Sequence, residues 1–183
     1  MKGISIILVF TIAASGASSH KDAQPRRVCW PLHFAGLTVG LSNDSHMRRL
    51  LGDGVFRKNE GDTGGRIIID SARTSTLHAQ FYTDRTIGEL TLSRGVEPGL
   101  TKSEQEQAAS KYFNPREGFG NWHALHLGSN KDAVLANLGP PESGGTTDEW
   151  TYFTACVCEL DEYFTITFVN GHISKVLFAA PSG

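Results

Sequence analysis

The sequence predicts an α+β fold of two tandem units, each a helix, a loop and a three-stranded antiparallel sheet, joined by a linker helix. Three observations predict it: an internal repeat, a short glycine-ended helix in each repeat, and three alternating segments after each helix. The predicted organisation is a signal peptide at 1–17, a first α+β repeat at 18–98, the linker helix at 99–114 and a second α+β repeat at 115–183.

Composition places the chain among ordinary globular proteins. Of its 183 residues, 39% are hydrophobic and 20% are charged. The formal net charge is −2, with 17 basic and 19 acidic residues, which argues against a nucleic-acid-binding protein because such proteins usually carry a basic patch. No internal apolar run reaches the roughly 18 residues of a membrane-spanning helix, so no stable membrane span is expected.

The first segment has the pattern of a secretory signal peptide. A basic start at Met1-Lys2 precedes an apolar stretch at 3–14 and small residues at 15–17. We expect cleavage after Ala17, with Ser19 as the alternative. No cysteine directly follows the small residues, so no lipid anchor is expected, and the mature protein is predicted to be periplasmic or secreted.

Three cysteines would enter an oxidising compartment after export. They are Cys29, Cys156 and Cys158, an odd number that leaves one unpaired. Cys156 and Cys158 point the same way on a predicted strand, where a bond between them would be strained. The expected disulfide therefore joins Cys29 to one of the other two. The alternative is a reactive or metal-binding Cys-x-Cys motif.

The internal repeat decides the predicted architecture. Residues 34–40 align with residues 122–128 at an offset of 88. Three further matches follow in order at offsets of 87, 87 and 86: 51–52 with 138–139, 81–84 with 168–171, and 87–90 with 173–176. Ordered matches at a nearly constant offset indicate a duplication.

Each repeat begins with a short amphipathic helix that has recognisable ends. Ser42, and either Ser129 or Asn130, are the expected N-caps, because their side-chain oxygens can accept an N–H of the first turn. Gly52 and Gly139 are the expected C-terminal glycines, since glycine adopts the left-handed conformation at little cost.

The linker helix is predicted from its start. Thr101 and Glu104 have the spacing of a capping box. The residues that follow are mostly polar, so we expect a surface helix anchored by Tyr112 and Phe113.

Three strands are expected in each unit. A glycine-rich connector, at 61–65 in the first unit and 143–147 in the second, joins the helix to these strands, and an Asn170-Gly171 hairpin turn joins the last two strands of the second unit. Their predicted ranges are 66–71, 75–83 and 87–93 in the first unit and 149–157, 163–169 and 172–179 in the second. The alternation directs a set of apolar side chains inward: Leu77, Ala79, Phe81, Phe164, Ile166 and Phe168.

The repeat resembles a known exported bacterial module. The residues that carry the resemblance are Leu127-Gly128, Val134, residues 138–141, residues 168–173 and Val176 in the second unit, with Leu41-Ser42, Leu51-Gly52, Phe81 and Ile87 in the first. A single unit resembles the SmpA/OmlA family of the outer-membrane assembly machinery. The tandem arrangement resembles the β-lactamase inhibitory protein (BLIP-like) family. The resemblance implies the fold and, through it, a sheet or loops that meet a partner protein.

No catalytic constellation, metal site or cofactor motif is predicted. His123 and His126 are three residues apart, but no Cys or carboxylate nearby completes a ligand set. Asp161 and Glu162 are expected in a solvated turn. A Cys/His hydrolase or ligand-binding protein is kept as a further alternative, since Cys156 or Cys158 with a histidine supplies the necessary residue types.

The predicted functional surface is the outward face of the strands. Five side chains share it in this interpretation: Trp150, Tyr152, Tyr163, Tyr82 and His78. Aromatic side chains with polar tips are typical anchors of protein interfaces. The alternative is that helix, linker and loops cover them. We therefore predict a protein-binding module that inhibits or neutralises another exported or envelope protein, such as a cell-wall-active enzyme or a toxin, with an accessory role in envelope assembly as the alternative.

Overall fold

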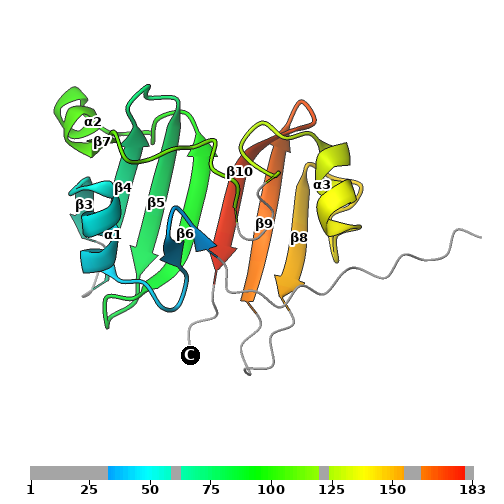
Figure 1. Ribbon diagram of the computed structural model, residues 1–183, viewed down its shortest axis with the longest axis horizontal. Coiled ribbons are helices and arrows are strands. Elements are labelled where there is room, and N and C mark those ends of the chain that lie inside the picture. Colours follow the sequence, from blue (N-terminus) through cyan, green and yellow to red (C-terminus); the bar gives the residue numbers. More distant parts are fainter. Residues whose placement is uncertain (1–32, 59–62, 120–123, 155–161, 180–183) are drawn as a thin grey trace, which may run out of the picture.

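The computed structural model describes residues 33–58, 63–119, 124–154 and 162–179, and within them the protein is mostly β. Eight strands form one sheet in the order β3-β4-β5-β6-β10-β9-β8, with β7 paired in parallel to β4 (Figure 1). Their bounds are β3 Val55–Lys58, β4 Gly64–Asp70, β5 Ser75–Phe81, β6 Ile87–Arg94, β7 Ala109–Ser110, β8 Glu149–Thr154, β9 Glu162–Val169 and β10 His172–Ala179. A separate hairpin of β1 (His33–Phe34) and β2 (Leu37–Thr38) completes the strands, and the helices are α1 (Asp44–Leu51), α2 (Lys102–Ala108) and α3 (Lys131–Leu138).

The predicted pair of helix–loop–three-strand units is wrong, because the two halves share a continuous sheet. β6 of the first repeat pairs antiparallel with β10 of the second, from Lys175 opposite Ser93 to Ala179 opposite Glu89. Separate units would leave the backbone groups of both strands unpaired at exposed edges, whereas pairing the two edges satisfies them. An alternating sequence pattern defines a strand but does not identify its neighbours.

The ends of the helices follow local side-chain chemistry. Asn43, rather than the expected Ser42, caps α1, and its side chain accepts the His46 N–H at 2.9 Å. Asn130, one of the two expected residues, caps α3 in the same way. The C-terminal glycines are confirmed: Gly52 and Gly139 follow the two helices with φ of 96° and 81°.

The linker contains a shorter helix than expected. α2 begins with the predicted capping box, in which Thr101 and Glu104 bond reciprocally, but it ends at Ala108 and leads into β7. Phe113 is buried and its ring meets Phe34 at 6.1 Å, as expected of an anchor. Tyr112 does not anchor the segment, because it is 64% exposed.

One face of the sheet carries the main core. The β1–β2 hairpin, α1 and α3 pack against this face, which we call the core face (Figure 1). Four residues between β7 and α3 join the same core: Phe113, Phe119, Leu125 and Leu127. The predicted inward residues of β5 and β9 all lie on it and are at most 4% exposed. The opposite face is covered by α2 only near β3 and β4, where a small second cluster forms from Val55, Ile67, Ile69, Leu100 and Ala108.

Within the described ranges, no helix is both long and apolar enough to cross a bilayer.

Candidate functional site

Two of the five predicted interface residues belong to the core. Trp150 is 3% exposed and Tyr152 is 4% exposed. In the β8–β9 ladder, Trp150 lies opposite Ile166 and Tyr152 opposite Phe164, and residues directly opposite each other point to the same face. The sequence analysis therefore assigned the inward and outward faces of β8 the wrong way round. After Glu149, its alternating residues are aromatic or threonine in both phases, so the hydrophobicity of those residues did not distinguish the two faces.

Both buried aromatic side chains find partners for their polar tips. The Trp150 indole N–H donates to the Thr147 carbonyl at 3.2 Å, and the ring meets Phe168 edge-on at 4.7 Å. The Tyr152 hydroxyl donates to the Gly139 carbonyl at 3.2 Å. Burial raises the pKa of Tyr152 well above its ordinary value, and the nearby Glu142 raises it further.

The other face of β5, β6, β10, β9 and β8 forms a regular array, which we call the open face. The strand registers place its residues in three rows of five: Gln80, Glu89, Ala179, Tyr163 and Phe153; His78, Thr91, Leu177, Thr165 and Thr151; and Thr76, Ser93, Lys175, Thr167 and Glu149. All but Thr76 and Ala179 are half-buried or exposed. No described helix covers these rows, since α2 packs beside β3 and β4.

Three of the predicted residues lie on or beside the open face. Tyr163 and His78 are members of its rows. Tyr82 follows β5, and its ring lies over Gly88, where an added Cβ would come within 2.5 Å of Cε1. Burial raises the pKa of Tyr82, with smaller contributions from the neighbouring Glu89 and Asp84.

Phe153 is the aromatic residue of this face that the sequence analysis missed. It is 45% exposed, and its ring centroid is 6.5 Å from that of Tyr163, directly across the β8–β9 ladder. If the sequence analysis had directed Trp150 and Tyr152 inward, the same alternation would have placed Phe153 on the outward face. Beside this pair, the Thr151 and Thr165 hydroxyls lie 3.4 Å apart.

His78 sits at the border between the open face and the part covered by α2. Its Nε2 lies 3.0 Å from the Gln80 amide nitrogen, over Gly65, where a Cβ would come within 2.5 Å of that ring nitrogen. Burial lowers the pKa of His78; Glu97 and Arg57 act in opposite directions and more weakly.

The lowered pKa of His78 predicts a pH-dependent stability. Below pH 6.5 the unfolded chain binds a proton at His78 that the folded protein resists, so stability should fall as pH decreases from 7 through 6.5 to the lower folded-state pKa. His78→Gln is expected to flatten this dependence in urea unfolding midpoints measured between pH 7.5 and 5. His172→Gln, which changes an exposed ring at the β9–β10 turn, is the control and should retain the wild-type profile. Identical profiles for His78→Gln and the wild type would contradict the assignment.

Several predicted features lie outside the described residues: the signal peptide at 1–17, Cys29, Cys156, Cys158, His123 and Asp161. His126 is described, and its Nδ1 lies 2.8 Å from the Leu127 carbonyl oxygen. Within the part of the chain that the structure describes, no group of three or more His, Cys, Asp or Glu residues could hold a metal ion.

A serine–histidine pair occurs at the start of α1. The Ser42 Oγ lies 3.1 Å from the His46 Nδ1, the contact expected of a nucleophile and its base. The same Oγ also accepts the Thr38 N–H at 2.9 Å, while the Ser42 backbone bonds to Thr38 and Ile87. Ser42 is 4% exposed. These contacts fasten the turn between β2 and α1, and no described carboxylate bonds to the His46 ring.

Comparison with known proteins gives one distant match. No family model matches the sequence, and no curated protein matches it. Among solved structures, the protein is similar to a DUF4309 family protein, YjgB, from Bacillus subtilis subsp. subtilis str. 168. The two share 16% sequence identity over 80% of this chain and 83% of the other, with a TM-score of 0.45.

Proposed function

We propose that this protein is an exported protein-recognition module, and that its open face binds another exported or envelope protein and blocks that protein's activity. The observation that carries the proposal is the pair of exposed Phe153 and half-buried Tyr163 at one border of an array that contains five threonines. Large aromatic side chains with neighbouring groups that exclude water are the usual anchors of protein interfaces.

The distribution of charge on the open face favours a protein partner. Its middle row contains threonine, leucine and a histidine whose burial favours the neutral ring. Glu89, Glu149 and Lys175 lie in the two outer rows. Interface centres are depleted of charge and surrounded by polar rims. Thirteen accessible positions, all of the fifteen except the buried Thr76 and Ala179, supply the centre of an interface, for which about 20–30 residues per side is usual.

Affinity capture from the host's exported fractions, compared between the wild type and Tyr163→Ala, tests the proposal. Loss of the ring is expected to weaken partner binding by about 2 kcal/mol or more, roughly 30-fold, because Tyr163 is an anchor on the face. The captured partner, an enzyme or a toxin, should lose activity in the presence of the wild-type protein and regain it with the variant.

The matched control is Tyr112→Ala, which removes an equally large exposed ring outside the open face. Its binding should equal that of the wild type. A partner retained equally by Tyr163→Ala would place the interface elsewhere. A partner that binds through Tyr163 but keeps its activity, such as an envelope-assembly component, would contradict the inhibitory role.

A further inference from the structure

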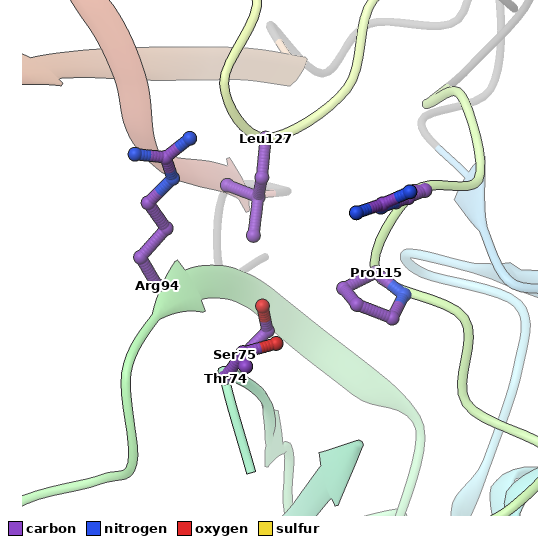
Figure 2. A pocket seen from close by; sticks show the side chains of 6 residues that line it. Thr74, Ser75, Arg94, Pro115 and Leu127 are labelled. Carbon is purple, nitrogen blue, oxygen red and sulfur yellow. The ribbon is translucent and has the colours of Figure 1, made fainter. Parts of the chain in front are cut away.

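A pocket at the end of the sheet, on the side of the core face, has no role in the proposed function. It has a volume of about 330 Å³ and lies where β5 begins and β6 ends (Figure 2). Six residues line it: Thr74, Ser75, Arg94, Pro115, Arg116 and Leu127. Two of these are arginines and none is acidic, so the side chains that line the pocket carry positive charge only.

The two arginines have no anionic partner in the described residues. Arg48, Arg57 and Arg66 each form an ion pair with a carboxylate, whereas neither Arg94 nor Arg116 has an ion pair or a side-chain hydrogen bond within the described ranges. Their guanidinium groups therefore retain their donors for a ligand.

Both arginines extend from backbone that is held in place. Arg94 pairs with Ser75 at the end of the β5–β6 ladder, and its side chain lies against Gly128, where an added Cβ would come within 2.5 Å of Nη2. The Arg116 N–H donates to the Asn114 side chain at 3.1 Å, in a turn closed by a second bond to the Asn114 carbonyl. The backbone that carries the two exposed side chains is thus fixed by hydrogen bonds on both sides of the pocket.

The floor of the pocket adds hydroxyl groups. Figure 2 shows the Ser75 and Thr74 oxygens directed toward the space between Arg94, Leu127 and Pro115. The Thr74 hydroxyl donates to Asp70 at 3.1 Å, while the Ser75 hydroxyl has no bond within the described residues. The nearby Asp70 carboxylate is 4% exposed and accepts four hydrogen bonds from residues 72–75. Its charge is therefore satisfied by its own loop.

We propose that this pocket binds the phosphate or carboxylate group of a small organic anion. The planar guanidinium groups of Arg94 and Arg116 can each donate two parallel hydrogen bonds to such an oxyanion. The Ser75 hydroxyl supplies a further donor, and Leu127 and Pro115 contact the apolar part of the ligand. The volume lies at the small end of the range of about 300–1,000 Å³ for ligand sites. The proposal is independent of the open face, because Ser75 and Arg94 point to the core face, as Leu77 and Leu92 do.

Calorimetric titration of the purified protein with inorganic phosphate and, separately, with citrate tests this site. Ionic strength is held constant with sodium chloride, and each anion is raised to about 10 mM, enough to detect a Kd of about 1 mM. At least one anion should bind, and the stronger of the two identifies the ligand as a phosphate or a carboxylate. Arg94→Gln and Arg116→Gln should each weaken binding about tenfold or more. Arg94→Lys keeps the charge but cannot donate two parallel hydrogen bonds, so it should weaken binding less.

Arg49→Gln is the matched control, because it removes the same charge from the exposed surface of α1. It should bind the anion as the wild type does. Melting temperatures without anion should be equal for all variants, which shows that they fold. Failure of both anions to bind the wild type, or an equal loss in Arg49→Gln and Arg94→Gln, would overturn the proposal.

Discussion

Replacing Trp150 by alanine is expected to lower the free energy of unfolding by about 3–5 kcal/mol. The residue is 3% exposed, and its ring packs edge-on against Phe168 at a centroid distance of 4.7 Å. The substitution also removes one of the two donors to the Thr147 carbonyl, the other being the Lys131 ammonium at 3.0 Å. It removes as well the ring beneath that ammonium, which lies 5.5 Å from the ring centroid. Chemical denaturation at neutral pH measures the loss.

The matched comparison is Phe153→Ala on the same strand. Phe153 lies three residues away on the open face and is 45% exposed, so its loss should cost less than about 1 kcal/mol. The sequence analysis placed Trp150 on the outward face as a binding anchor, which implies the reverse: a loss of binding with stability nearly unchanged. A small loss for Trp150→Ala together with a large one for Phe153→Ala would mean that β8 faces the other way.

Local signals in the sequence predicted most of the individual elements. Gly52 and Gly139 end their helices with positive φ, and Thr101 and Glu104 form the expected capping box. These features depend on neighbouring residues only, so a single sequence contains the information. The hairpin at Asn170-Gly171 formed for the same reason: both residues have positive φ, which the turn requires.

Arrangement of the strands could not be predicted in the same way. The β6–β10 pairing joins residues more than 80 positions apart, and neither strand contains a signal for its partner. β3, from Val55 to Lys58, was missed because its two apolar residues are followed by two basic residues, so its sequence does not alternate.

The candidate site was predicted in part for a related reason. Tyr163 and His78 were assigned to the outward face because their strands alternate between clearly apolar and polar residues. The β8 strand alternates between Trp150 or Tyr152 and Thr151 or Phe153, so the burial of one set depends on the neighbouring strand. The arginine pocket was not predicted, because Arg94 and Arg116 meet only through the tertiary fold.

Asp44→Ala is expected to destabilise the protein by about 3–5 kcal/mol, because it leaves the guanidinium of Arg66 buried without its anion. The Arg66 side chain is 8% exposed, and its Nε and Nη2 donate to the two Asp44 carboxylate oxygens at 2.5 and 3.0 Å. Arg66 also donates to the Asp53 carbonyl and lies over the Phe56 ring. These contacts hold the cation in place, so it cannot turn to solvent when Asp44 is lost.

A second substitution distinguishes two causes of the stability lost in Asp44→Ala: the uncompensated charge of Arg66 and a change in the packing of α1. Adding Arg66→Met to Asp44→Ala removes the uncompensated charge and keeps apolar volume over Phe56, so the double variant should be more stable than Asp44→Ala alone. Arg48→Ala, which breaks the exposed pair with Asp53, should change stability little, since exposed pairs contribute little. Urea unfolding of the three variants and the wild type gives the comparison. A double variant less stable than Asp44→Ala would show that Arg66 stabilises the fold mainly through Asp53 and Phe56, and that the ion pair with α1 is secondary.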